Sequence, residues 1–271
     1  MYRLIIGIIL FLSINISAGE LKLIGKLESG SLIIGKAEGA IKVTLNKEEL
    51  PIDENGTFIF GFDRDETGTY FLKVKYAEGN IEAHKLTVEK REYNIQRINN
   101  MKKKYVTAPN KELDRIAKER EIKKEYRTKI GDVKKALYKK GFYKPVKRSR
   151  RSSVFGSQRI LNGVPKNFHN GVDYAAPRGT PVYAMTDGIV VQAADNFYYS
   201  GNFILIDHGQ GLNSFYLHLS KKDVKEGDII KKGQEIGEIG TTGRSTGPHL
   251  HWGVQWYNKR VDPEYLLGMK F

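Results

Sequence analysis

Short runs of alternating hydrophobic and polar residues fill two stretches of the chain, residues 19–90 and residues 153–271. The first stretch contains SLIIGK, AIKVTL, GTFIFGF and TYFLKVKY, separated by Gly, Asp and Asn. The second contains GIVVQAA, NFILIDHG, NSFYLHLS and HLHWGVQW, with glycines in almost every gap. Such runs between turn-forming residues predict β-strands. We expect a small antiparallel sandwich over the first stretch and a compact all-β domain over the second.

The intervening residues 91–152 follow another pattern. Hydrophobic residues recur mostly at steps of three and four, which predicts a helix that begins at Asn110 and ends near Gly141. They are Leu113, Ile116, Ile122, Tyr126, Ile130, Val133 and Leu137. We therefore expect three regions: a β domain over 19–90, a basic helical linker over 91–152 and a β domain over 153–271.

The basic character of the chain is concentrated in that linker. Residues 91–151 hold 22 Lys and Arg against 7 Asp and Glu, and the remainder holds 23 against 24. We expect a solvated helical spacer; the competing hypothesis is a surface for anionic envelope polymers such as teichoic acid or phospholipid headgroups. Nucleic acid is not expected as a partner, because no aromatic stacking motif interleaves the charges.

The first residues predict a secretory signal over residues 1–18. Arg3 is followed by a short apolar run over residues 4–14, and Ser17, Ala18 and Gly19 offer small residues for cleavage. A membrane span needs about 20 apolar residues, roughly twice this run. We expect an exported protein of the periplasm or cell envelope, without a membrane span in its mature form.

The strand HLHWGVQW raises the question of chemistry, because it places two of the six histidines one residue apart. Alternate side chains of a strand share a face, so His249 and His251 form a polar row opposite Leu250 and Trp252. In NSFYLHLS the same alternation predicts that His218 lies on a polar face. That face would also hold Ser214 and Tyr216, opposite Phe215, Leu217 and Leu219.

The segment FHNGVDYAAP adds a carboxylate. His169 and Asp173 would stand about 13 Å apart in an extended chain, too far to hold one small ion. We expect a bend at Asn170-Gly171, with His169 before it and Asp173 on the strand that follows. The chain has no cysteine, so a transition metal would be held by histidines and carboxylates.

Two histidines and one carboxylate would leave a fourth position for water, as in catalytic zinc sites. The helical motif HExxH is absent, so a base must come from elsewhere, and His218 and His249 are the candidates. For His208 we expect a structural role. For Arg159 two hypotheses stay open: it holds the loop before His169, or it meets substrate.

The succession HNGVD, YLHL and GRSTGPHLHWGV resembles the lysostaphin and LytM-type zinc metallopeptidases, over about residues 153–267. The resemblance implies that His169, Asp173 and His251 bind Zn2+ and that His218 and His249 assist catalysis. It also implies an all-β peptidase domain with a groove over the zinc, and peptide cross-links of bacterial peptidoglycan as substrate. Residues 19–90 resemble the immunoglobulin-like modules that precede catalytic domains in bacterial envelope enzymes.

The fold class expected is therefore mainly β, with an immunoglobulin-like domain, the basic linker and a LytM-type peptidase domain over 153–271. The expected function is zinc-dependent hydrolysis of peptidoglycan stem-peptide cross-links, in particular as a D,D-endopeptidase. The alternative is a non-catalytic LytM-type activator of other wall hydrolases. Retention of all five candidate residues favours the enzyme.

Overall fold

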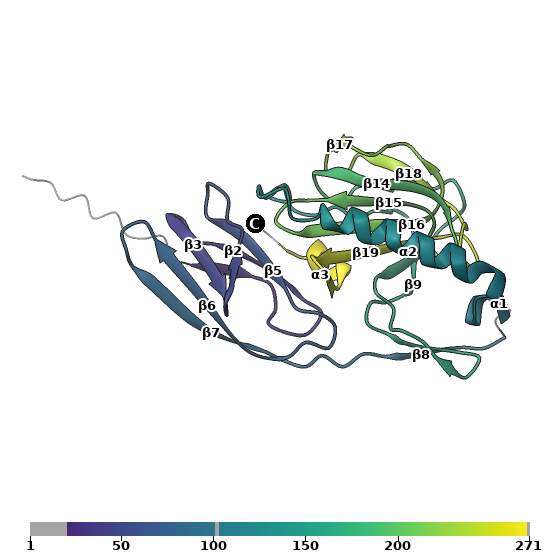
Figure 1. Ribbon diagram of the computed structural model, residues 1–271, viewed down its shortest axis with the longest axis horizontal. Coiled ribbons are helices and arrows are strands. Elements are labelled where there is room, and N and C mark those ends of the chain that lie inside the picture. Colours follow the sequence, from purple (N-terminus) through teal and green to yellow (C-terminus); the bar gives the residue numbers. More distant parts are fainter. Residues whose placement is uncertain (1–20, 101–102, 270–271) are drawn as a thin grey trace, which may run out of the picture.

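The structure is a computed structural model that describes residues 21–100 and 103–269. The predicted signal, residues 1–18, lies outside the described residues. The molecule is mainly β, as predicted: strands of the N-terminal part lie at one end and a larger sheet at the other (Figure 1). Among the described helices, none combines the length and the apolar character needed to cross a membrane.

The N-terminal strands form two antiparallel sheets, in the orders β1-β2-β5 and β4-β3-β6-β7. Their inward residues, such as Ile33, Phe60, Val43 and Val74, are buried in a common core. The strands are β1 (Lys22–Ile24), β2 (Leu32–Lys36), β3 (Ala40–Leu45), β4 (Glu48–Leu50), β5 (Thr57–Gly61), β6 (Gly68–Tyr76) and β7 (Ile81–Val88). Two sheets around one core agree with the expected sandwich, and its immunoglobulin-like character stays a prediction.

The two ends of the molecule share one hydrophobic core. A Cβ atom at Gly61 of β5 would lie 3.1 Å from Val261 Cγ1 and 3.2 Å from Trp256 Cβ of the C-terminal part, so β5 packs tightly against these side chains. Ion pairs flank this contact, with Arg91 Nη1 2.9 Å from Asp262 Oδ2 and Lys259 Nζ 2.6 Å from Glu66 Oε1. The N-terminal sheets are thereby fixed against the domain that carries the candidate site.

The linker is only partly helical, which corrects the predicted helix. It contains strand β8 (Ile95–Ile98), helix α1 (Lys103–Val106), a 3₁₀ turn (Asn110–Glu112) and helix α2 (Leu113–Thr128). Asn110 does not cap α2, and the helix ends well before Gly141. Gly131 adopts a φ of 96°, and the chain then forms backbone hydrogen bonds to the C-terminal domain, from Gln210 N to Val133 O (2.6 Å) and from Leu137 N to His208 O (3.0 Å). These two hydrogen bonds take the place of the backbone hydrogen bonds of a continued helix.

Helix α2 has no buried residue, in accord with the expected solvated helix, but one of its faces also contacts the C-terminal domain. Positions four apart share a helix face, and Glu119 and Lys123 both contact the loop that follows β14. Glu119 accepts hydrogen bonds from Tyr198 N at 2.8 and 3.0 Å, and Lys123 Nζ lies 2.6 Å from Ser200 Oγ. The carbonyl of Ser200 accepts in turn from the backbone N–H of His218 at 3.0 Å. The helix thus braces a loop beside a candidate catalytic residue.

The large sheet has ten strands, with the main order β17-β14-β15-β16-β19-β12-β9. These are β9 (Arg150–Ser153), β12 (Val172–Ala175), β14 (Gly188–Phe197), β15 (Gly201–Asp207), β16 (Leu212–Lys222), β17 (Ile229–Ile230) and β19 (His249–Trp256), joined at the side by β13 (Pro181–Tyr183), β18 (Glu235–Ile239) and β20 (Lys259–Val261). Strands β10 (Gln158–Leu161) and β11 (Val164–Pro165) form a separate small sheet with β8, and α3 (Pro263–Leu267) follows β20.

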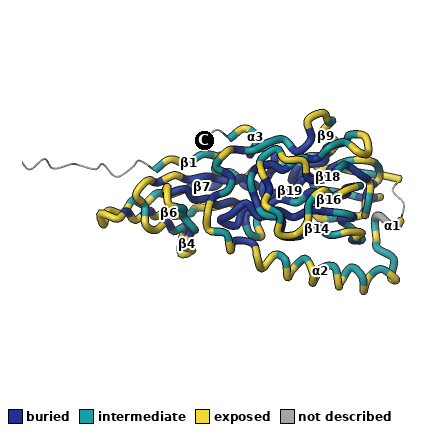
Figure 2. The backbone as a smooth tube through the Cα atoms, turned by 90° about the horizontal axis from the view of Figure 1, so that it is seen from above, coloured by how far each residue is buried: buried dark blue, intermediate teal, exposed yellow. Residues whose placement is uncertain are grey.

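The two faces of the large sheet differ. One face carries Tyr216 and Trp252, both fully buried in the core. On the other face, Phe215 packs with Val191 and Leu205 beneath Tyr126 of α2 and the adjoining Ile130. Helix α2 lies along one side of the molecule (Figure 2), and its last turn packs on this second face through Tyr126. The part of this face on β19 and β12 carries the candidate site.

Candidate metal centre

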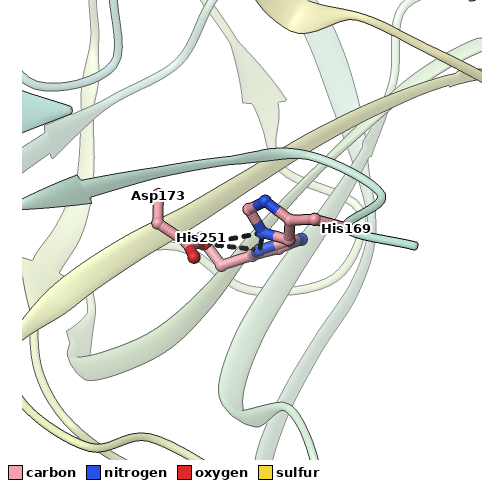
Figure 3. Close-up of side chains that lie close together, drawn as sticks. All are labelled: His169, Asp173 and His251. Atoms are coloured by element: carbon pink, nitrogen blue, oxygen red, sulfur yellow. Dashed lines mark hydrogen bonds and ion pairs between the residues drawn. The ribbon is translucent and has the colours of Figure 1, made fainter. Parts of the chain in front are cut away.

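Three predicted ligands meet on this part of the sheet. Asp173 of β12 is the register partner of His251 of β19, so both side chains project from the same face. His169 lies in the loop before β12, across the predicted bend. The distances are 3.0 Å from His169 Nε2 to Asp173 Oδ1, 2.9 Å from His169 Nε2 to His251 Nδ1 and 2.8 Å from His251 Nδ1 to Asp173 Oδ1 (Figure 3). All three side chains are buried.

Gly171 makes the close approach of the loop possible. A Cβ atom there would lie 2.4 Å from the carbonyl oxygen of Trp252 and 2.9 Å from Nε2 of His251. Both distances are shorter than van der Waals contact, so any side chain at this position would push the loop away from β19. The absence of a side chain lets His169 reach the other two groups.

The hydrogen bonds around His169 determine which nitrogen faces the centre. Its Nδ1 lies 3.0 Å from the carbonyl oxygen of Val154, which can only accept, so the proton of the neutral ring resides on Nδ1. The lone pair of Nε2 then points at Asp173 and His251. The three atoms that face one another therefore hold more lone pairs than protons. Because they are buried, a bound cation would be favoured there.

The donor set fits Zn2+. A tetrahedral zinc with bonds of about 2.1 Å holds neighbouring ligand atoms about 3.4 Å apart. The three atoms, which lie 2.8–3.0 Å apart, need to separate only slightly to bind the ion. Among the described residues, His169, Asp173 and His251 are the one group of three or more His, Asp or Glu that can converge on a metal. Three protein ligands leave one position for a water or substrate oxygen, as in catalytic zinc sites.

Arg159 contacts the centre through Asp173. Its Nη2 lies 2.9 Å from Asp173 Oδ2, so one carboxylate oxygen binds the guanidinium and the other faces the two imidazoles. Burial alone would raise the pKa of Asp173, but the neighbouring His169 and His251 hold that pKa well below its usual range. The geometry gives Arg159 a further role, holding the carboxylate of Asp173; the two hypotheses, that it holds the loop before His169 or meets substrate, stay predictions.

His218 and His249 lie beside the centre. His218 Nδ1 is 2.8 Å from the carbonyl of Thr242, and His249 Nδ1 is 2.8 Å from the carbonyl of Gly247. Each carbonyl fixes the proton of the neutral ring on Nδ1, which leaves Nε2 as the free acceptor. The two ring centroids are 4.8 Å apart, and His249 Nε2 is 4.0 Å from Asp173 Oδ1. The pair therefore lies within reach of a group held at the triangle without belonging to it.

His218 lies on the face of the sheet that carries the site, but not through the simple alternation that we predicted for its strand. Tyr216 pairs with Trp252 and Leu217 with His251, so Leu217 lies on the site face and Tyr216 in the core. Simple alternation would therefore turn His218 into the core. Instead, an extra residue in β16 shifts its register against β15, and His218 adopts a φ of 67°. This bulge turns the imidazole to the site. The prediction that Ser214 and Tyr216 line the site face was wrong.

Burial keeps two of these imidazoles neutral near pH 7. It lowers the pKa of His251 to about 4, against the opposing effect of Asp173. It lowers the pKa of His218 to about 3, helped by the nearby His249 and His251. Neutral imidazoles have the lone pairs that metal binding and proton acceptance require.

His208 lies apart from this cluster. It is fully buried, with Nδ1 2.7 Å from the carbonyl of Asp187 and Nε2 2.7 Å from Ser214 Oγ. Burial lowers its pKa to about 4. These contacts give His208 the structural role that the sequence suggested.

Sequence reasoning missed two residues at the centre, Gln96 and Ser153. Ser153 Oγ lies 2.9 Å from His169 Nδ1, and Gln96 Oε1 lies 3.1 Å from Ser153 Oγ. Neither residue belongs to a motif, and they come from segments far apart in the chain. No signal in the sequence alone could have brought them together.

A buried triangle of two imidazoles and a carboxylate, beside two further histidines on an open face, is the arrangement of metal-dependent hydrolase sites among others. Residues 167–263 match the model of peptidase family M23. The C-terminal domain of this chain belongs to that family, as its motifs indicated.

Curated relatives match this same part of the chain. Peptidoglycan DD-endopeptidase ShyA of Vibrio cholerae is 45% identical over 130 residues, which cover 47% of this chain and 29% of ShyA. DD-carboxypeptidase/endopeptidase Mpg of Neisseria meningitidis is 40% identical over 131 residues, or 48% of this chain and 30% of Mpg. The matched regions thus span less than a third of either relative.

One crystal structure resembles the chain over most of its length. It is assigned to peptidase M23 from Pseudomonas aeruginosa, with a TM-score of 0.64 and 26% sequence identity. The match covers 90% of this chain and 96% of that one. The similarity therefore includes strands before residue 167 as well as the M23 domain.

Proposed function

We propose that this protein is a zinc-dependent endopeptidase that hydrolyses peptide cross-links of bacterial peptidoglycan, in particular as a D,D-endopeptidase. The observation that carries the proposal is the buried triangle of His169, Asp173 and His251 with two uncommitted imidazole nitrogens beside it. The substrate is inferred from ShyA and Mpg, whose names describe peptidases of this kind. Peptidoglycan also implies action in the periplasm or cell envelope, in accord with the predicted signal.

In this proposal three side chains bind the zinc through defined atoms. They are His169 through Nε2, His251 through Nδ1 and Asp173 through Oδ1, the three atoms that face one another. When bound, zinc supplies a Lewis acid that polarises a peptide carbonyl and lowers the pKa of a water molecule towards about 7. Arg159 holds Asp173 through the other carboxylate oxygen, at 2.9 Å.

His218 and His249 carry the proton transfers. Each presents an unprotonated Nε2 to the site because its Nδ1–H is bound to a backbone carbonyl. One Nε2 accepts the proton of the attacking water and later delivers it to the leaving amine. The other takes up a proton from solvent at its Nε2 and donates a hydrogen bond to the oxygen that gains negative charge.

The alternative, a non-catalytic activator of other wall hydrolases, has less support. An activator needs neither a metal-binding triangle nor two histidines whose ring nitrogens are held free. Here the backbone carbonyls of Thr242 and Gly247 hold both catalytic candidates in one tautomer. Such an arrangement serves proton transfer and has no evident use in a binding module.

Digestion of purified sacculi tests the proposed activity. We expect the zinc-loaded full chain to release peptides cut at the D-alanyl-diaminopimelate cross-link, identified by mass spectrometry. A chelator should stop the release, and added zinc should restore it, because the attacking water depends on the metal. Release that continues at full rate without metal would contradict the zinc mechanism. Undigested cross-links under every condition would favour the activator instead.

We also propose that the basic face of α2 attracts anionic envelope polymers. Arg120 and Arg127 are exposed and form no ion pair among the described residues, and they line a groove of about 600 Å³ that extends to Tyr199 and Asn258. Co-sedimentation with anionic vesicles tests this. Binding should fall when salt rises from about 0.1 M to about 1 M, because the screening length shrinks from about 10 Å to about 3 Å. The doubly substituted R120E/R127E chain should bind weakly at both salt concentrations. Binding equal to that of the unsubstituted chain would overturn the proposal.

A further inference from the structure

Strand β8 brings the linker to the metal centre. It pairs in parallel with β10, and Gln96 is the register partner of Arg159. Backbone hydrogen bonds extend the pairing at both ends, from Gln158 N to Asn94 O and from Asn162 N to Ile98 O, each 2.9 Å long. Residues 94–98 are thus anchored against the segment that carries Arg159, although they precede the family-matched residues 167–263 by a long interval.

The side chain of Gln96 joins two groups that support the candidate ligands. Its Oε1 accepts from Arg159 Nε at 3.2 Å and from Ser153 Oγ at 3.1 Å. The nitrogen of a guanidinium can only donate, so the Gln96 atom that faces it must be the amide oxygen. That assignment makes the hydroxyl of Ser153 a donor towards Gln96.

The direction of these hydrogen bonds determines how the ring of His169 and the carboxylate of Asp173 face the centre. Because Ser153 gives its only proton to Gln96, its oxygen must accept from both Arg159 Nη2 (3.2 Å) and His169 Nδ1 (2.9 Å). Acceptance from His169 agrees with the proton that the carbonyl of Val154, 3.0 Å away, already holds on Nδ1, so Ser153 adds a second contact that orients the ring with the lone pair of Nε2 towards the centre. Arg159, anchored at Nε, meanwhile directs Nη2 to Asp173 Oδ2 at 2.9 Å.

We propose that Gln96 is a positioning residue of the metal centre: through Ser153 it orients the ring of His169, whose tautomer the carbonyl of Val154 already sets, and through Arg159 it holds the carboxylate of Asp173. The inference rests on the proposed zinc site and deepens it. The metal affinity of the peptidase domain then depends on a residue of the linker. Groups that orient metal ligands in this manner typically change metal affinity by about 10- to 100-fold when removed.

Zinc affinity, measured on the full chain by competition with a chromophoric chelator, tests the proposal. We expect Gln96→Ala to weaken zinc binding by about 10- to 100-fold. Gln96→Glu keeps an acceptor oxygen at the same length and should restore affinity to near the original value. Arg97→Ala is the matched control, because Arg97 is the next residue of β8, is exposed and takes no part in these contacts.

Replacement of zinc by Co2+ adds a measurement that a loss of stability alone would not change. The visible spectrum of bound Co2+ reports ligand geometry, and it should change in Gln96→Ala while remaining unchanged in Arg97→Ala. Gln96→Met, similar in length but without the acceptor, replaces the alanine variant if β8 is lost. Unchanged affinity and an unchanged spectrum in a folded acceptor-free variant would overturn the role of Gln96. Absence of zinc binding in the unsubstituted chain would instead overturn the proposed function.

Discussion

Asp173→Ala is expected to lose its zinc and all measurable peptidoglycan hydrolysis. Asp173 supplies the one charged ligand of the triangle, with Oδ1 2.8 Å from His251 Nδ1 and 3.0 Å from His169 Nε2. The substitution also leaves the half-buried guanidinium of Arg159 without its carboxylate, which destabilises the surroundings of the site. Metal analysis of the purified variant should find close to zero zinc, against about one ion per unsubstituted chain.

Two companion variants make this experiment decisive. Asp173→Asn keeps the volume of the side chain and removes its charge, so zinc loss there reflects the ligand and not a cavity. Asp195→Ala removes an exposed carboxylate of the same sheet, which pairs with Lys222, and should retain both zinc and activity. Full zinc occupancy in Asp173→Ala, with the fold intact by circular dichroism, would show that the metal binds elsewhere.

His218→Ala and His249→Ala are expected to retain zinc and to lose about 10²- to 10⁴-fold in kcat, the usual range for general acid–base groups. His249 Nε2 lies 4.0 Å from Asp173 Oδ1, whereas the atoms of the triangle lie 2.8–3.0 Å apart. We therefore expect these two side chains to contribute to proton transfer and not to metal binding. Zinc content and single-turnover rates on a defined cross-linked peptide measure both quantities for each variant.

His84→Ala serves as the control for this pair. His84 lies on β7, partly exposed beside Glu82 and remote from the centre, so its loss should change neither zinc content nor rate. His251→Ala should behave like Asp173→Ala and lose its zinc. If His249→Ala emptied the site while His251→Ala kept its zinc, the roles of these two histidines would be reversed.

The strand pattern predicted much of the architecture because alternation is a local property. HLHWGVQW forms β19, with His251 on the site face and Trp252 in the core, as its period of two requires. The bend between His169 and Asp173 followed from chain length, since an extended segment would separate them too far. In both places a local geometric constraint left a single arrangement.

Local patterns misled where tertiary contacts override them. The helical spacing continued to Leu137, yet the chain leaves the helix at Thr128 and pairs its backbone with the loop around His208. His218 reaches the site through a bulge, which reverses the face that alternation assigns to it. A bulge adds one residue against a neighbouring strand, and the sequence of one strand does not show its register.

The sequence by itself determined which residue types could bind a metal and in which order they occur, because motif spacing and strand periodicity are written along the chain. The tertiary structure decided how those groups are held. Gln96 meets Arg159 and Ser153, which contact Asp173 and His169, only because β8 crosses from the linker to lie beside β10. Contacts between segments so far apart depend on the packing of the whole domain, and no short pattern encodes them.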